Sequence, residues 1–574
     1  MRRDTLPDLE RLLAYARGEK PADLCLKGAK VFDVFSATFH EEDLYLAEGV
    51  ILGRAPRRAV KELDLSGLYL LPGFIEAHLH LESSYLLPQE IAPLLLARGT
   101  TTVIADPHEI ANVLGLSGIY YLLCEARRTP IDFFFTVPSC VPASPLETPG
   151  AILSADEVAA LLEEKPFIAL GELMNYPDTI AGKGDFLAKI RAARARGKAI
   201  DGHAPGLTGK DLEAYRLAGP SSDHESSSLE EAREKLRAAM RLFIRRGSVA
   251  NNLPSLLPLV TPENSVFISL VSDDVSAREL AEEGHLDRSL REAVAFGLPP
   301  EVALRMVTLS PAFHFGLSDR GGIFPGARAD LVAVSDLRKI DVRFVWAAGK
   351  LVFREGECLF KPQKPAPFPE HPLRLPEKID LKVPAKGDRI RVLGIVPGEI
   401  LTEHLIFRAK IEKGEVVPDI SRDLLKIVCL ERHHGTGNYT IGFVRGFGLK
   451  RGALGSTVAH DSHQLLLVGT NDRDLLLAAR RLEECGGGLV AVAEGEILAE
   501  LPLPVGGIIS TLSAKEVIRR LEDLGKAAKE LGATHPEPFM ALSFLALPVI
   551  PSLRITDRGL VDVENFSFVD LFAG

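Results

Sequence analysis

The stretch Leu70–His80 reads LLPGFIEAHLH and ends in two histidines that are separated by a single leucine. Phe74, Ile75 and Ala77 indicate the end of a buried β-strand. Because side chains alternate between the two faces of a strand, both histidines are expected on one side and Leu79 on the other. Two imidazoles at the carboxyl end of a strand can share a divalent cation, and parallel barrels carry their chemistry at this end. The stretch therefore predicts a barrel strand with a metal site.

Seven more short runs follow and complete a count of eight strands. They cover residues 101–106, 131–137, 166–171, 198–202, 221–223, 248–253 and 266–272. Segments compatible with helices alternate with them, for example Ser154 to Glu164, Phe186 to Arg196 and Ser228 to Arg246. This alternation predicts an α/β fold, a (β/α)8 TIM-like metal-dependent barrel over residues 70–315.

Histidines and carboxylates stand where five of these strands give way to loops. They are His78, His80, Glu172, His203, His224 and Asp273. Any one of them could be an ordinary strand-end or core residue, but six such coincidences at one end of one barrel favour a metal site. Four imidazoles and two carboxylates exceed what one cation needs. We therefore predict two divalent cations that are bridged by a carboxylate and a hydroxide.

The segments after the barrel differ in character. Residues 361–388 form a proline-rich stretch that predicts a semi-rigid linker. A further α+β domain is expected over residues 389–574. Before the barrel, residues 22–69 contain short β-like runs, and residues 322–334 resume the same character after the last barrel helix.

Several long motifs resemble the amidohydrolase superfamily and, within it, the adenine deaminase family of bacteria and archaea. In the barrel they are residues 72–84, 105–113, 171–175, 222–225 and 272–274, and beyond it residues 432–437, 446–452, 458–463 and 539–551. The likeness covers nearly the whole chain, and the C-terminal motifs are absent from the wider superfamily. It implies that residues 1–69 and 316–360 pair as one small composite β domain.

The resemblance also implies the reaction. A metal-activated hydroxide attacks C6 of adenine, and the products are hypoxanthine and ammonia. Many superfamily members bridge their metals with a carboxylated lysine, but Lys165 precedes the fourth strand instead of ending it, so Glu172 is the expected bridge. Oxygen and nitrogen ligands suit Mn²⁺ or Fe²⁺, and Zn²⁺ as well.

The proton transfers require further groups. Asp273 is the candidate to move a proton from the hydroxide to the leaving amine, although a role as a ligand alone is equally consistent. Ring nitrogen N1 must also gain a proton. Glu82, Glu109, Glu225 and His108 lie on loops after barrel strands, and Glu82 and Glu225 rank first because they are closest to ligands. Charged loop residues are also often simply solvated.

The amino-acid composition limits which kinds of molecule the protein is expected to bind. The chain has 574 residues, 46% hydrophobic, and can bury more than one core. Its 67 basic and 78 acidic residues give a net charge of −11, which argues against a nucleic-acid surface, so a free base such as adenine, or a nucleoside, fits better than a polymer. Met1–Pro7 lacks an apolar signal core, and we expect a cytoplasmic protein without a membrane partner. A homodimer or larger homo-oligomer is also expected.

Two points stay open at this level. A cyclic-amide or N-acetyl hydrolase would use the same barrel ligands, and a non-enzymatic relative is a third alternative that the complete ligand set disfavours. In the C-terminal domain, His433, His434, His460, Asp461 and His463 crowd two short loops. Such loops can hold a second metal or line a pocket, and we predict pocket lining.

Overall fold

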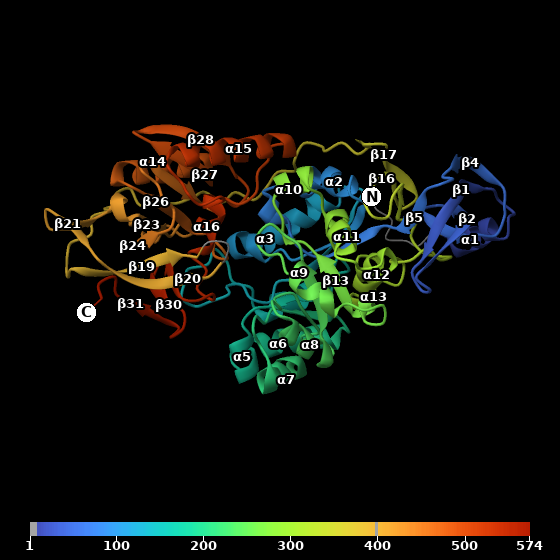
Figure 1. Cartoon of the computed structure of the whole chain (residues 1–574), viewed down its shortest axis with the longest axis horizontal. Coiled ribbons are helices and arrows are strands. Elements are labelled where there is room, and N and C mark those ends of the chain that lie inside the picture. The colour runs from blue at the N-terminus through green and yellow to red at the C-terminus, as the bar shows by residue number, and fades with distance from the viewer. Residues whose placement is uncertain (1–7, 397–399, 574) are drawn as a thin grey trace.

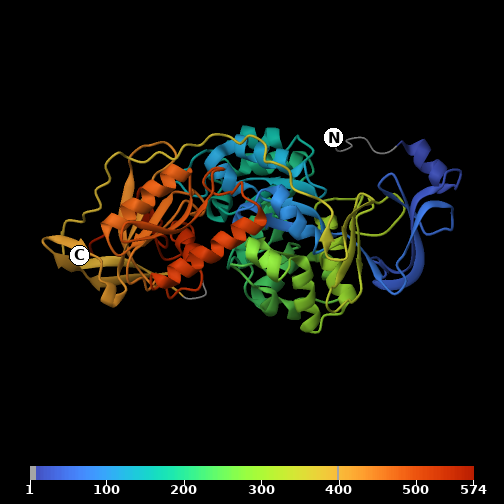
Figure 2. The same cartoon turned by 90° about the horizontal axis from the view of Figure 1, so that it is seen from above.

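The computed structural model describes residues 8–396 and 400–573, so the prediction made for Met1–Pro7 lies outside the described residues. Figure 1 shows three parts along the longest axis: a β-rich part drawn in blue and yellow, a central α/β part, and an orange and red C-terminal part. The turned view in Figure 2 shows the yellow segment between the second and third parts running along the outside of the central part.

The central part is built on a curled parallel sheet. Its strands are β6 (Phe74–His80), β7 (Thr100–Ala105), β8 (Asp132–Val137), β9 (Phe167–Leu173), β10 (Ala199–Gly202), β11 (Ser222–Asp223), β12 (Arg241–Arg245), β13 (Ile268–Val271) and β14 (Asp273–Asp274). One ladder runs in the order β10-β9-β8-β7-β6-β14 and a second in the order β11-β12-β13. Only Ser272 separates β13 from β14, so the second ladder leads directly into the first.

This arrangement confirms the predicted TIM-barrel-like α/β class. Between β10 and β11 the backbone hydrogen bond lies just before β11, where the Ser221 amide donates to the Ile200 carbonyl (2.8 Å), and the Ser222 hydroxyl of β11 adds a side-chain hydrogen bond to Asp201 Oδ1 of β10 (2.7 Å). Within the described residues the sheet is therefore a curled half-barrel without a continuous ladder around it. All its strands still place their carboxyl ends on one side, which is what a shared site requires.

The seventh strand was predicted wrongly. The helix expected from Ser228 to Arg246 is shorter: α8 (Leu229–Arg237) ends before Ala239, whose φ is 58°. The chain then forms β12, whose Leu242, Phe243 and Ile244 are buried between β11 and β13. Residues 248–253, expected as the strand, form a loop that leads into α9 (Leu253–Leu256). A short apolar run does not reveal by its periodicity whether it is a buried strand or the end of a helix.

The helices cover the outside of the curled sheet. Two of them, α4 (Ala155–Leu161) and α6 (Phe186–Ala195), lie within predicted segments, and Ser154 caps α4 in a capping box with Glu157. The others are α2 (Pro88–Leu96), α3 (His108–Ala126), α5 (Tyr176–Ala181), α7 (Gly209–Ala218), α10 (Ala277–Glu282), α11 (Leu286–Ala295), α12 (Pro300–Met306) and α13 (Leu309–His314).

Segments from both sides of the central part share one nine-stranded sheet. It contains β1 (Ala22–Asp33), β2 (Thr38–Ala47), β3 (Val50–Gly53), β4 (Ala59–Asp64), β5 (Tyr69–Pro72), β15 (Leu331–Val334), β16 (Val342–Ala347), β17 (Lys350–Arg354) and β18 (Glu357–Cys358), with α1 (Leu9–Ala16) before it. The antiparallel pairing of β15 with β5 joins the two segments. Because only Gly73 separates β5 from β6, this sheet fixes the start of the strand that carries His78 and His80.

The C-terminal part is an eight-stranded sheet with helices. Its strands are β19 (Arg389–Ile395), β20 (Thr402–Arg408), β23 (Leu425–Leu430), β24 (Tyr439–Arg445), β25 (Ala453–Ser456), β26 (Leu465–Gly469), β27 (Gly488–Ala493) and β28 (Glu496–Pro502). The remaining elements are β21 (Lys410–Glu412), β22 (Glu415–Val417), α14 (Asp472–Cys485), α15 (Ala514–Glu530), α16 (Pro538–Phe544), β29 (Leu553–Thr556), β30 (Gly559–Asp562) and β31 (Ser567–Val569). Throughout residues 8–396 and 400–573, every helix is too short or too polar to cross a membrane.

Candidate metal centre

The two histidines of β6 point into one buried cluster. His78 Nε2 lies 3.3 Å and His80 Nε2 lies 3.1 Å from the same oxygen, Oδ1 of Asp273. Leu79 is fully buried in the apolar core instead. His80 Nδ1 lies 3.1 Å from the Asp106 carbonyl, to which it can only donate. The proton is therefore on Nδ1, and His80 Nε2 turns a lone pair toward the cluster.

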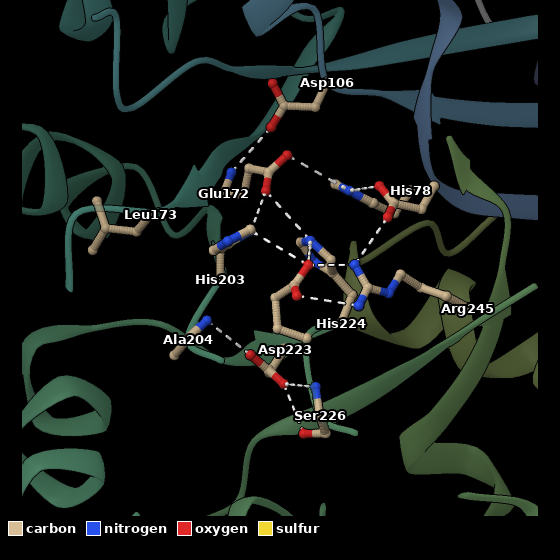
Figure 3. Close-up of polar contacts among 12 residues, drawn as sticks. His78, Asp106, Glu172, Leu173, His203, Ala204, Asp223, His224, Ser226 and Arg245 are labelled. Atoms are coloured by element: carbon tan, nitrogen blue, oxygen red, sulfur yellow. Dashed lines mark hydrogen bonds and ion pairs between the residues drawn. The ribbon is translucent and has the colours of Figure 1, made fainter. Parts of the chain in front are cut away.

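Glu172, near the end of β9, lies at the centre of the cluster. Its Oε1 is 3.1 Å from His80 Nε2 and 3.7 Å from His78 Nε2. Its Oε2 is 2.8 Å from His203 Nδ1 and 3.3 Å from His224 Nε2. Figure 3 shows Glu172 between His78 on one side and His203 and His224 on the other. Each carboxylate oxygen thus faces its own pair of imidazoles.

Asp273 faces the cluster with one oxygen and a guanidinium with the other. Its Oδ2 accepts a hydrogen bond from Arg245 Nη1 at 3.1 Å. Arg245, labelled in Figure 3, ends β12 and also pairs with Glu225. Arg245 was not predicted as a site residue, because the sequence pattern placed it in a helix. The run Leu242–Ile244 directly before it was the signal that could have revealed the strand.

The structure therefore brings all six predicted ligands together, and their donor atoms fit divalent cations. His78 Nε2 and Glu172 Oε1 are buried and have no hydrogen-bond partner among the described residues. Buried polar atoms are nearly always satisfied, so these two require a partner that the side chains around them do not supply. The sets His78–His80–Glu172, His78–His224–Asp273 and Glu172–His203–His224 each bring three ligand atoms within 4.8 Å of one another. Imidazole nitrogens and carboxylate oxygens suit Mn²⁺, Fe²⁺ or Zn²⁺.

The three other predicted catalytic residues have different surroundings. Glu82 is buried, its Oε1 accepts from the Ile110 amide (3.0 Å), and its Oε2 has no partner among the described residues. Burial raises the pKa of Glu82 to about 7. Burial also raises the pKa of Glu225, but its ion pair with Arg245 outweighs this effect and lowers the pKa from its ordinary value. His108 lies with Nδ1 3.5 Å from Glu172 Oε1. Glu82 is thus the group best suited to carry a proton.

Buried acidic residues hold the ligand-bearing backbone in place. Glu76 Oε1 accepts from the His78 amide (3.0 Å), and its Oε2 accepts from the Ser272 amide (3.1 Å), next to Asp273. Asp106 Oδ2 accepts from the Glu172 amide (3.0 Å). The sequence analysis gave neither residue a role. A charged residue inside an otherwise apolar strand, as Glu76 is, was the available signal.

The C-terminal histidines divide into two groups. His460 Nδ1 and His463 Nε2 contact the two carboxylate oxygens of Glu109, which follows His108 in the central part. Asp461 Oδ1 lies 4.0 Å from His108 Nε2. His433 and His434 do not reach Glu109: they contact the carbonyls of Ser462 (2.7 Å) and Pro149 (2.9 Å). One of the two loops therefore faces the metal cluster, and the other supports it.

Comparison with known families agrees with this geometry. The profile of the amidohydrolase family matches residues 69–251 and 253–352, which include the curled sheet and all six residues of the ligand cluster. The profile of the adenine deaminase C-terminal domain matches residues 399–567. The fold and the site are thus those of the amidohydrolases, a class of metal-dependent hydrolases. The C-terminal part restricts the comparison to amidohydrolases that carry the adenine deaminase C-terminal domain.

Curated relatives resemble the whole chain. An adenine deaminase from Desulfatibacillum aliphaticivorans is 44% identical over 98% of this chain and 99% of its own. An adenine deaminase from Kosmotoga olearia is 44% identical over 98% of this chain and 99% of its own. One from Methanoregula boonei is 45% identical over 99% of this chain and 100% of its own. The chain belongs to the adenine deaminase family.

Proposed function

We propose that this protein hydrolytically deaminates adenine to hypoxanthine and ammonia. The observation that carries the proposal is the convergence of four imidazoles and the Asp273 carboxylate around Glu172, on a chain similar to adenine deaminases over nearly its full length. A cyclic-amide or N-acetyl hydrolase would share the ligands. The match to the adenine deaminase C-terminal domain favours adenine.

His78, His80 and Asp273, with Glu172 Oε1, would hold one divalent cation, and His203 and His224, with Glu172 Oε2, would hold a second. Mn²⁺ and Fe²⁺ are our first candidates and Zn²⁺ the third. When bound, such cations polarise the substrate and lower the pKa of water toward about 7. Because Glu172 is an ordinary carboxylate, loading should not depend on bicarbonate.

The protein's own residues would handle the protons. Asp273, oriented by Arg245, takes a proton from the attacking water and delivers it to the exocyclic amine as this amine leaves. Glu82, whose Oε2 has no hydrogen-bond partner among the described residues, supplies the proton that N1 gains when C6 becomes tetrahedral, and it recovers a proton from the C6 hydroxyl as the carbonyl of hypoxanthine forms. Glu225 and His108 position their neighbours: Glu225 holds Arg245, and His108 lies between Glu172 and Asp461.

Ammonia release by the purified, metal-loaded protein tests this function. We expect release from adenine and none above background from adenosine, cytosine or dihydroorotate under the same conditions. Hydrolysis of dihydroorotate or of an N-acetyl sugar without deamination of adenine would favour the alternative. Metal analysis of the same samples should give about two ions per chain.

We further propose that residues 70–315, which contain the curled sheet, form a complete (β/α)8 barrel. Residues 1–69 with 316–360 would form a composite β domain, 361–388 a linker, and 389–574 a C-terminal domain. The pairing of β15 with β5 supports the composite domain. A cytoplasmic location, a homodimer or larger homo-oligomer, and the absence of nucleic-acid and membrane partners stay predictions.

A further inference from the structure

Glu109 joins the loop of residues 459–464 to the central part. It lies in the first turn of α3, after β7, and is buried. Its two carboxylate oxygens contact His460 and His463. The loop is fixed from its other side, because His433 Nε2 bonds the Ser462 carbonyl (2.7 Å) and the Arg432 guanidinium donates to the His463 carbonyl. The loop is therefore held in one conformation from two sides.

The two histidines on Glu109 are not equivalent. His463 Nδ1 accepts a hydrogen bond from the Ala459 amide (3.1 Å), so its proton must be on Nε2, which donates to Glu109. His463 is thus a neutral imidazole with both nitrogens occupied. It has no lone pair left for a cation, which argues against a metal held by Glu109, His460 and His463.

His460 keeps one nitrogen free. Its Nδ1 bonds Glu109, while its Nε2 has no hydrogen-bond partner among the described residues. Its ring stacks on Phe544, with the centroids 4.7 Å apart and the planes 16° from parallel. Burial lowers the pKa of His460, but Glu109 and then Asp274 outweigh this effect and raise the pKa to about 9. Held on Glu109 through Nδ1, a protonated His460 presents its Nε2–H group to a ligand.

The position of His460 is at the mouth of the curled sheet. Glu109 follows β7, and Asp274, whose charge acts on His460, ends β14. These two strands flank β6, which carries His78 and His80. Phe544, on which the His460 ring stacks, lines a cavity of about 750 Å³ between the central and C-terminal parts, together with Ser83 and Tyr85 of the loop after β6, so His460 lies behind one wall of this cavity. This volume is in the range of small-molecule sites.

Resting on the proposed deamination of adenine, we propose that His460 is a substrate-binding residue whose Nε2–H donates a hydrogen bond to N7 of the purine. N1 and N7 are the two ring nitrogens nearest C6, and Glu82 is already assigned to N1. Negative charge spreads into the ring as C6 becomes tetrahedral. A cationic donor held in advance at N7 stabilises this charge without reorganising.

The wild-type protein alone gives the first test. In 7-deazaadenine a C–H group replaces N7. The control compound is 3-deazaadenine, which keeps N7. We expect kcat/KM for 7-deazaadenine to be about 10- to 100-fold below that for adenine, the usual loss when a charge-stabilising donor loses its acceptor. Nearly equal values for adenine and 7-deazaadenine would overturn the role of His460. A failure to deaminate adenine with any metal would instead overturn the proposed function itself.

Two matched variants give the second test. His460→Gln should lower kcat/KM for adenine to a similar extent. In this variant the kcat/KM values for adenine and 7-deazaadenine should differ by no more than about threefold, because the His460 side chain and N7 of the purine act as one pair. His463→Gln removes a contact with the same carboxylate but no free donor, so it should keep the wild-type ratio. A full ratio in His460→Gln would overturn the inference. If His460→Gln does not fold, Phe544→Leu, which removes the stacking partner, should lower the ratio partially, and an unchanged ratio would count against His460.

Discussion

Arg245 Nη1 lies 3.1 Å from Asp273 Oδ2, while the other oxygen of Asp273 faces both histidines of β6. One carboxylate is thus divided between a fixed guanidinium and the ligand cluster. The backbone of Asp273 has a φ of 59°, in the left-handed region that few non-glycine residues adopt. Local strain of this kind persists where the surrounding structure enforces it. Here the hydrogen bond from the neighbouring Ser272 amide to Glu76 helps to fix the backbone.

Asp273→Asn should leave a folded protein with nearly inactive chemistry. The amide keeps one oxygen for ligation but cannot accept the proton that the carboxylate accepts. We expect kcat to fall by roughly 10²-fold or more, the usual scale for loss of a general acid or base. Steady-state kinetics with parallel metal analysis check this. Near-normal turnover would assign the proton transfer to another residue.

Arg245→Gln should destabilise the protein because it leaves the Glu225 carboxylate without its cation. Breaking a buried ion pair typically costs about 3 kcal/mol or more. The double variant Arg245→Gln with Glu225→Gln should recover part of this loss, since the Glu225 charge is removed together with its partner, whereas Asp273 still loses its contact with Arg245. Chemical denaturation of the wild type and the three variants gives the coupling energy. Simple addition of the two single effects would show that the pair is not coupled.

His203→Ala and His224→Ala should each give a folded protein with depleted metal and little activity, because residues at the mouth of a barrel contribute more to chemistry than to the core. His404→Ala is the control, since His404 lies on β20 and is 3.9 Å from Asp562. Elemental analysis after dialysis against a chelator measures the retained metal. Full metal content in both site variants would exclude these residues as ligands.

Gly171→Ala should disturb Glu172 without touching any ligand. A methyl group at Gly171 would collide with Asp106 Oδ2, the atom that accepts from the Glu172 amide. We expect loss of about 10-fold or more in metal affinity or activity, as is common when support behind a ligand is removed. Gly525→Ala is the matched control, because Gly525 is half-buried in α15 and an added methyl group there meets no atom within 4 Å. Equal metal affinity in both variants would contradict the prediction.

Glu147→Gln should stabilise the protein at neutral pH. Burial, followed by the charges of Asp461 and Asp557, raises the pKa of Glu147 well above its ordinary value. The folded protein keeps this carboxyl protonated while the unfolded chain ionises it, so wild-type stability falls as the pH rises above about 4.5. The variant lacks this loss and should gain on the order of 1 kcal/mol at pH 7. The denaturation midpoint of the variant should exceed that of the wild type at pH 7 but not near pH 4. A gain that is the same at both pH values would show that the ionisation of Glu147 is not its cause.

The sequence was sufficient to predict the parallel α/β class because buried strands end in polar residues at regular intervals. It could not predict β12, since Leu242–Ile244 is as compatible with the end of α8 as with a strand, and Arg245 was therefore missed. The convergence of the six residues around Glu172 followed from strand order. The pairing of Glu109 with His460 did not, because no local pattern links residues that are 351 positions apart.

That long separation affects how the protein is made. The strands β6 to β14 emerge from the ribosome before the C-terminal part, and domains usually fold as they emerge. The strands carrying the ligands can therefore assemble while the segment with His460 has yet to be synthesised. A chain that stops early, or is cut after β18, would lack His460 and His463, the residues that contact Glu109 beside this cluster. Only the full-length chain therefore carries both sides of this contact.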